Sequence, residues 1–147
     1  GSRPGDANQL NSGTPLKGVR VRAVDDEPDS LQLVARILEA RGAQVTKASS
    51  AAEGMQRLEE SRPDILLSDI GMPEQDGYGF IRRVRQMASL SSLPAVALTA
   101  LARSEDRTHA LNAGFQTHVA KPVEPHELVA VVASLASLSG PREPVQA

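Results

Sequence analysis

Acidic, hydroxyl and amine side chains follow four of the apolar runs in this 147-residue chain. Asp25 and Asp26 come directly after the first run, and Asp69, Thr99 and Lys121 close three later ones. Taken singly, an aspartate in such a place is most often a helix cap or a turn former. Three carboxylates, a hydroxyl and an ammonium at the ends of otherwise apolar segments exceed what packing alone requires. Their recurrence predicts one shared polar site.

The chemistry of such a site follows from its charges. Crowded carboxylates repel one another, so they share protons or hold a cation. Oxygen ligands in small number favour Mg²⁺ over Ca²⁺. The Lys121 ammonium and the Thr99 hydroxyl would then stabilise the oxygens of a transferring phosphoryl group. Asp69 is the only one of the three carboxylates that stands alone on its strand, so we predict that it is the nucleophile and forms an aspartyl phosphate.

The segments that position these residues alternate between strands and helices. Apolar runs predict strands over 19–24, around residue 45, and over 65–67, 94–99 and 116–120. Helices are predicted to begin near Pro28, Ser50, Gly77, Ser104 and Pro125. The predicted buried faces include Ala52, Met55 and Leu58 in the second helix and Leu128, Val131, Val132 and Leu135 in the last. Short connections between strands require crossovers, so we expect an α/β protein with a doubly wound parallel sheet whose ligands bind at the carboxyl ends of its strands.

Composition excludes several classes of protein. The chain has no cysteine, which rules out disulfides and thiolate metal sites and favours a cytoplasmic location. A net charge of −2 provides no electrostatic basis for binding nucleic acid or an anionic membrane. With only Tyr78, Phe80 and Phe115 as aromatic residues, there is little to build a base-stacking surface from. No Walker loop or GxGxxG is present, so the phosphoryl group would arrive on something other than a nucleotide held by such a loop.

The two ends of the chain lack hydrophobic periodicity. Residues 1–16 are rich in Gly, Ser, Asn and Pro, and we expect an expression scar followed by a flexible linker. Residues 139–147 are expected to form a flexible tail. The folded domain is therefore predicted over residues 17–138.

Four sequence blocks in this domain resemble the signature blocks of two-component response-regulator receiver domains. They are VDDEP at 24–28, SDIGMPEQDGY at 68–78, LTA at 98–100 and AKP at 120–122. Thr99 follows Asp69 by 30 residues and Lys121 follows Thr99 by 22, separations typical of receivers. The resemblance implies a flavodoxin-like (βα)5 fold with a five-stranded parallel sheet in the order 2-1-3-4-5.

The resemblance also implies roles for the acidic residues. Asp69 would accept a phosphoryl group from a phosphohistidine on a histidine kinase or a histidine phosphotransfer protein. Mg²⁺ would be held directly by Asp26, largely through water by Asp25, by the side chain of Asp69 and by the backbone carbonyl of Gly71. The domain would catalyse its own phosphorylation and dephosphorylation without being a free-standing enzyme.

Residues on the later strands would read out the phosphorylation. Thr99 and Lys121 would bind the phosphoryl oxygens, and the Lys121–Pro122 peptide bond would be cis. Receivers switch a surface made of their fourth helix, fifth strand and fifth helix by drawing the threonine inward while an aromatic residue rotates. His118 stands at that second position, where Tyr or Phe is more usual. It is either an exposed histidine without a role, or a residue that functions through a change of rotamer or through sensitivity to pH.

Arg22 is a second departure from the receiver pattern, because it stands in a strand where an aliphatic residue is usual. Two explanations are open: its head group reaches out to solvent over a packed stem, or the strand begins later than residue 19.

The resemblance around residues 110–128 favours the C-terminal receiver of a hybrid sensor histidine kinase, with a stand-alone regulator as the alternative. A monomer or weak dimer without direct contact to nucleic acid or membrane is expected. Two other functions compete with the phosphoacceptor. A phosphorylation-independent interaction module would leave the acidic pocket inert. A Mg²⁺-dependent phosphohydrolase would require a DxD pattern after the first strand, which the adjacent Asp25 and Asp26 do not provide.

Overall fold

The computed structural model describes residues 15–71, 77–100 and 104–136. Strands in these ranges are β1 (Arg20–Val24), β2 (Gln44–Ala48), β3 (Ile65–Asp69), β4 (Ala95–Thr99) and β5 (Thr117–Ala120). The helices are α2 (Pro28–Glu39), α3 (Ala51–Glu60), α4 (Gly77–Gln86), α5 (Ser104–Ala113) and α6 (Pro125–Ala136), and η1 (Ala88–Leu90) is a 3₁₀ turn. The predicted alternation of strand and helix is therefore confirmed.

The strands form one parallel sheet in the order β2-β1-β3-β4-β5. This order confirms the expected flavodoxin-like, doubly wound topology. The register pairs Val24 with Ser68, Asp69 with Leu98, and Thr99 with Ala120. The carboxyl ends of β1, β3, β4 and β5 consequently meet at one edge of the sheet, where the loops that follow them converge.

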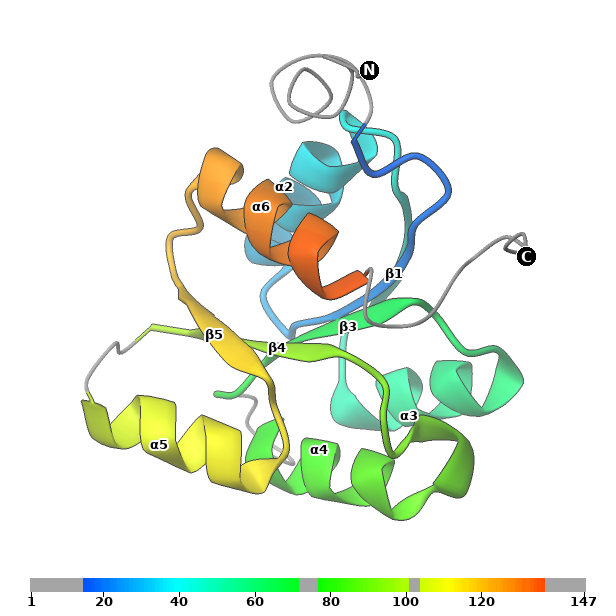
Figure 1. The fold of residues 1–147 in the computed structure, drawn as a ribbon, viewed down its shortest axis with the longest axis vertical. Helices are drawn as coiled ribbons and strands as arrows, with labels where there is room; N and C mark the ends of the chain where they lie inside the picture. The colour runs from blue at the N-terminus through cyan, green and yellow to red at the C-terminus, as the bar shows by residue number, and fades with distance from the viewer. Residues whose placement is uncertain (1–14, 72–76, 101–103, 137–147) are drawn as a thin grey trace, which may run out of the picture.

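Helices cover both faces of the sheet (Figure 1): α2 and α6 lie on one face, and α3, α4 and α5 on the other. Each layer buries its own apolar core. Val21 and Ala23 of β1 face the α2 and α6 layer, while Val24 faces the other, because successive strand residues point to opposite faces. Strands β3 and β4 are buried along their whole length, which explains their continuous apolar runs.

Local signals place the start of α3. Ser50 is the N-cap, and its Oγ accepts a hydrogen bond from the backbone N–H of Glu53 at 3.1 Å. The Glu53 carboxylate in turn accepts the N–H of Ser49 at 2.8 Å, so the predicted capping box reaches one residue further back than expected. The predicted burial of Ala52 is wrong: Ala52 is exposed, and Ala51 and Gly54 are buried with Met55 and Leu58.

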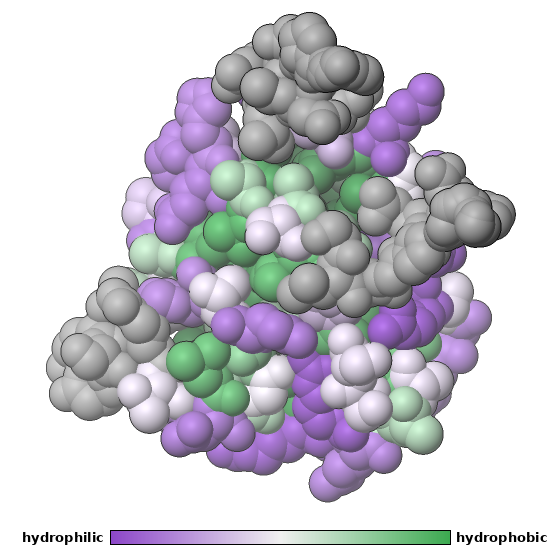
Figure 2. Space-filling model, in the orientation of Figure 1, coloured by the Kyte–Doolittle hydropathy of each residue, from purple (hydrophilic) through white to green (hydrophobic). Residues whose placement is uncertain are grey.

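The buried face of α6 also differs from the prediction in part. Leu128 and Val132 are buried as predicted, but Val131 and Leu135 are only partly buried. Val129 and Ala136 are buried instead. Helix α6 is apolar almost all round, so helical periodicity could not fix which side faces the sheet. Figure 2 shows the resulting apolar surface over α6, within a surface that is otherwise largely hydrophilic.

The strand begins at Arg20, one residue later than predicted, but Arg22 still lies within it, so the later start does not account for the arginine. The predicted reach of its head group to solvent is wrong, because Arg22 is buried to 4% exposure. Its Nη2 lies 3.3 Å from Oγ of Ser61, while its Nε and Nη1 are buried and have no hydrogen-bond partner. Burial lowers the pKa of this guanidinium. Arg22 is thus a costly residue at a position where the sheet packs against α3.

A second arginine joins the elements at the opposite edge of the sheet from the acidic residues. The Arg85 guanidinium donates to the carbonyl oxygens of Gly114 at 2.8 Å and Leu90 at 2.9 Å, and to Oε1 of Gln116 at 3.2 Å. The same Gln116 oxygen accepts the backbone N–H of Ala95. These bonds connect α4 to the ends of η1 and α5 and to the starts of β4 and β5.

Within the described ranges, no helix is both long and apolar enough to cross a bilayer. The predicted scar, most of the predicted linker and the predicted tail lie outside the described residues, so the limits of 17 and 138 stay predictions. Leu16, which the sequence placed in the linker, is fully buried.

Candidate functional site

The three predicted carboxylates meet at the carboxyl edge of the sheet. Oxygen atoms of Asp25, Asp26 and Asp69 all lie within 4.8 Å of one another. Asp25 and Asp69 are buried, whereas Asp26 is exposed. The backbone N–H of Asp25 donates to the carbonyl oxygen of Ala48 at 3.1 Å, which holds the end of β1 against β2. Because β1 and β3 are parallel neighbours in the sheet, the residues at their carboxyl ends form the cluster.

Lys121 provides the positive charge of this cluster. Its Nζ lies 3.0 Å from Oδ2 of Asp25 and 3.2 Å from Oδ1 of Asp69. The backbone N–H of Lys121 donates to the carbonyl oxygen of Thr99 at 2.8 Å, and the Lys121–Pro122 peptide bond is cis, as the resemblance implied. The ammonium is therefore positioned from β5 over carboxylates that belong to β1 and β3.

Glu27 belongs to the site although sequence reasoning missed it. Its Oε1 lies 3.0 Å from Nζ of Lys121, so three carboxylates surround one ammonium. The backbone N–H of Glu27 donates to Oδ1 of Asp25 at 2.9 Å. The only sequence signal was its place directly after the acidic pair, and that place alone does not show which way the side chain turns.

The electrostatics of the site reflect its burial. Burial raises the pKa of the Asp69 carboxyl, and the nearby charge of Asp25 raises it further, against the opposite effect of Lys121. Burial alone would lower the pKa of Lys121, but the ion pairs with Asp25 and Glu27 and the charge of Asp69 raise it well above its ordinary value. The ion pair with Lys121 lowers the pKa of Glu27. The carboxylates thus favour the charged form of Lys121, while burial disfavours the charge of Asp69.

The other predicted site residues lie around this centre. Thr99 is buried at the carboxyl end of β4, next to the strand that carries Asp69. Gly71 is exposed, and its backbone N–H bonds to the Asp69 carboxylate. His118 is half-buried on the edge strand β5, in register with Ala97. The roles predicted for Thr99, Gly71 and His118 stay predictions.

The residues present fit a hard divalent cation. Oδ2 of Asp25 is buried and receives no hydrogen bond of good geometry, although the Lys121 ammonium is close enough to form an ion pair. A buried carboxylate oxygen left in this way is costly unless a cation binds it. The donors of the cluster are carboxylate oxygens, which Mg²⁺ prefers.

An aromatic contact beside the site was also missed by sequence reasoning. The rings of Tyr78 in α4 and His109 in α5 stack with centroids 3.7 Å apart and planes inclined by 14°. His109 is exposed, as expected for a surface histidine, but the stack gives it a partner on a neighbouring helix. Residues 72–76, which join β3 to α4 in the chain, lie outside the described residues.

The doubly wound sheet, with an acidic triad and a lysine at the carboxyl ends of its strands, defines a class of α/β proteins whose polar site lies at that edge. Comparison with known proteins narrows this class. The family model for the response regulator receiver domain matches residues 21–133. The chain belongs to this family.

Individual relatives agree with that assignment. An uncharacterised 14.6 kDa protein from Leptolyngbya boryana is 47% identical over 117 residues, which cover 80% of this chain and 89% of that protein. Response regulator Rre1 of Synechocystis is 39% identical over 113 residues, covering 76% of this chain and 49% of the regulator. The chain thus spans about half the length of several curated regulators that it matches.

A solved structure shows the same fold. A putative response regulator from Chloroflexus aurantiacus superposes with a TM-score of 0.79 at 32% sequence identity. The superposition covers 82% of this chain and 99% of that one. The fold and the family named from the sequence blocks are therefore confirmed.

Proposed function

We propose that this receiver domain accepts a phosphoryl group on Asp69. The observation that supports this most directly is the convergence of Asp25, Asp26 and Asp69 with the Lys121 ammonium at one edge of the sheet. A carboxylate oxygen of Asp69 would form a bond to phosphorus while the bond from phosphorus to the imidazole nitrogen of a phosphohistidine breaks. The imidazole nitrogen takes the electron pair of that bond and a proton from water.

We assign the binding of Mg²⁺ to Asp26 directly, to Asp25 largely through water, to the side chain of Asp69 and to the backbone carbonyl of Gly71. The bound ion would neutralise negative charge on the transferring phosphoryl oxygens. The chain's own residues do the rest: Lys121 holds a positive charge beside Asp69, and burial excludes water from that carboxylate.

The later steps of signalling are assigned to β4 and β5. Thr99 and Lys121 would bind the phosphoryl oxygens of phosphorylated Asp69. Drawing Thr99 inward would shift the population of conformers of the surface made by α5, β5 and α6, with His118 in the place of the usual aromatic residue. That surface corresponds to the helix and strand set that switches in other receivers.

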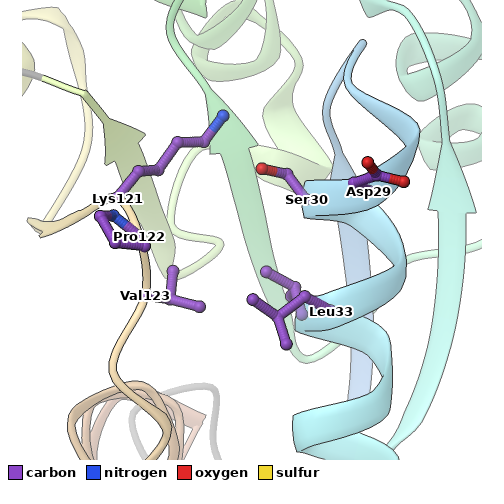
Figure 3. Close-up of a pocket in the computed structure, with 7 residues that line it drawn as sticks. Asp29, Ser30, Leu33, Lys121, Pro122 and Val123 are labelled. Atoms are coloured by element: carbon purple, nitrogen blue, oxygen red, sulfur yellow. The ribbon is translucent and has the colours of Figure 1, made fainter.

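The donor would be a histidine kinase or a histidine phosphotransfer protein. We propose that it docks at a pocket beside Lys121. The pocket has a volume of about 170 Å³ and opens between α2 and the start of the β5–α6 connection (Figure 3). Leu33, Val34, Pro122 and Val123 provide its apolar lining. Leu33 is 41% exposed at the pocket, so its side chain is available for contact with a partner. An apolar helix face carrying the phosphohistidine would bury Leu33 and bring its imidazole to Asp69.

The phosphoacceptor is tested by incubating the protein with acetyl phosphate and Mg²⁺ and measuring its intact mass. The wild type is expected to gain the mass of one phosphoryl group, and the gain is expected to disappear in Asp69→Asn and in excess chelator. A gain that survives Asp69→Asn would refute the assignment. Binding of Mg²⁺ without any adduct would favour the phosphorylation-independent interaction module, and turnover of a phosphate monoester would favour the phosphohydrolase.

The docking pocket is tested by comparing two donors. Leu33→Asp is expected to slow transfer from a phosphorylated histidine phosphotransfer protein and to leave phosphorylation by acetyl phosphate unchanged. Leu111→Asp is the matched control, because Leu111 is 51% exposed on α5. Equal loss of transfer in both variants would show that docking does not use the pocket beside Lys121.

We place the domain in the cytoplasm, as a monomer or weak dimer, at the C-terminus of a hybrid sensor histidine kinase. The location is proposed from the absence of cysteine, and the placement in a hybrid kinase from the resemblance around residues 110–128. The parent reading frame tests the last of them, since kinase domains upstream would be required.

A further inference from the structure

The ammonium of Lys121 contacts three carboxylates, of which one is not a candidate metal ligand. Asp25 and Asp69 belong to the acidic triad, and each lies within 3.2 Å of Nζ. Glu27 is outside the triad, and its Oε1 lies 3.0 Å from the same atom. The contact with Glu27 is a hydrogen bond donated by Nζ, and the contacts with Asp25 and Asp69 are ion pairs.

Glu27 binds Lys121 through its side chain and does not cap helix α2. It occupies the N-cap position of α2, where a side chain ordinarily accepts a backbone N–H, but it makes no side-chain cap hydrogen bond. Its carboxylate instead meets Lys121 and the hydroxyl of Ser30, which donates at 3.3 Å. Its backbone N–H is held by Asp25. The backbone of Glu27 is thus fixed to the acidic triad while its carboxylate is free of it.

A metal ion and Lys121 compete for the same oxygens. A divalent cation bound to Asp25 and Asp69 would take the two carboxylates that hold the ammonium and would also repel it, because like charges repel more strongly in a partly buried site than in water. An ammonium whose only partners were those two carboxylates would be driven from the site. Glu27 is the partner that the metal does not use.

We infer that Glu27 is a positioning residue that retains the Lys121 ammonium at the site when a divalent cation occupies the acidic triad. The inference rests on the metal site of the proposed function and assigns to Glu27 a role in it. With Glu27 in place, Lys121 gives up its contacts with Asp25 and Asp69 to the cation, keeps its contact with Glu27 and stays beside the phosphoacceptor. Without Glu27, cation binding releases Lys121 into solvent.

Lysine acylation read by mass spectrometry tests this directly, with no need for phosphorylation. The chain has three lysines, Lys17, Lys47 and Lys121. Lys17 and Lys47 are exposed and serve as internal references. In the wild type, Mg²⁺ is expected to leave the acylation rate of Lys121 nearly unchanged. In Glu27→Gln, Mg²⁺ is expected to raise that rate about two- to five-fold, the range that loss of one exposed ion pair supplies.

Asp29→Asn is the matched control. It removes the same charge from the same end of α2, and the structure shows no ion pair between Asp29 and Lys121. Acylation of Lys121 in this variant is expected to follow the wild type with and without Mg²⁺. Glu27→Ala is a second variant and is expected to behave as Glu27→Gln does.

Equal acylation of Lys121 in wild type and Glu27→Gln at saturating Mg²⁺ would overturn the inference, and so would an equal increase in Asp29→Asn. The outcome is separable from the phosphoacceptor test. If the wild type forms an adduct with acetyl phosphate but Glu27→Gln acylates as the wild type does, only the role of Glu27 fails. If the wild type forms no adduct, the phosphoacceptor assignment fails whatever the acylation shows.

Discussion

At the scale of single residues, the buried charge of Asp69 lowers the stability of the folded protein. Asp69 is buried beside a second buried carboxylate, Asp25, so its negative charge is disfavoured in the folded state even with Lys121 nearby. Because the pKa of Asp69 is higher in the folded protein than in the unfolded chain, the free energy of unfolding depends on pH. The favourable contribution of the protonated form is present at low pH and is lost as the pH rises from the unfolded pKa through the raised folded pKa.

Replacing the charge should therefore stabilise the protein. Asp69→Asn is expected to raise the free energy of unfolding in metal-free buffer at pH 7 by about 1 kcal/mol, the order of a typical single substitution. The gain should shrink as the pH falls below the raised pKa of Asp69, since the wild type is then neutral at this position as well. Urea unfolding across this pH range measures both effects.

The control is Asp26→Asn, which removes an exposed carboxylate from the same cluster. It should change the free energy of unfolding by less, because the Asp26 charge is already solvated. A loss of stability in Asp69→Asn at pH 7 would mean that the ion pair with Lys121 outweighs the cost of burying the charge.

At the scale of the elements, close packing of α3 against the sheet holds the second layer together. Gly54 faces β1 and α4: a Cβ built on it would lie 2.9 Å from Cγ2 of Val24 and 3.2 Å from Cζ of Phe80. Val24 is β-branched and fully buried, so it has little freedom to move aside. Gly54 lets α3 approach β1 and α4 closely, and its backbone conformation does not require a glycine.

Gly54→Ala is expected to destabilise the protein despite the better helix propensity of alanine. Overpacking costs about 1–3 kcal/mol, while the propensity gain returns about 1 kcal/mol. A net loss of up to roughly 2 kcal/mol in the free energy of unfolding should follow from these two effects. Gln56→Ala on the exposed face of α3 is the control and should change stability by less than about 0.5 kcal/mol. Stabilisation by Gly54→Ala would show that β1 and α4 can yield.

Two side-chain interactions of α4, with α5 and with the residue that follows it, lie at opposite ends of α4. The Tyr78–His109 stack involves the first turn of α4, and Arg85 binds the carbonyl oxygen of Gly114 beyond the end of α5. The chain that leads from Asp69 enters α4 at the stacked end.

At the scale of the whole molecule, cation binding should be coupled to folding. The acidic triad assembles β1, the chain after it and β3, which are far apart in sequence, so the unfolded chain offers no equivalent site. A ligand that binds only the folded state raises its stability by mass action.

We expect Mg²⁺ at roughly ten times its dissociation constant to raise the free energy of unfolding by about 1.4 kcal/mol. For a domain of this size the midpoint of thermal unfolding should rise by about 3–6 °C. Sodium chloride of matched ionic strength separates this effect from general screening, and Asp26→Asn should reduce it. An equal shift with both salts would show that the triad does not bind the ion.

The sequence by itself determined the order of the elements and the edge at which the chemistry gathers. Apolar runs, capping residues and the turns around Gly and Pro are signals of neighbouring residues, and they predicted all five strands and five helices. Since parallel strands bring their carboxyl ends together, the placement of Asp25, Asp26, Asp69 and Lys121 at one site followed from that order.

Only the tertiary structure decided how individual side chains are used. The turn of Glu27 toward Lys121, the burial of Arg22, the stack of Tyr78 on His109 and the face of α6 that meets the sheet all depend on contacts between distant segments. A local pattern specifies which element a residue belongs to, but it does not contain the position of the neighbour that the side chain will meet.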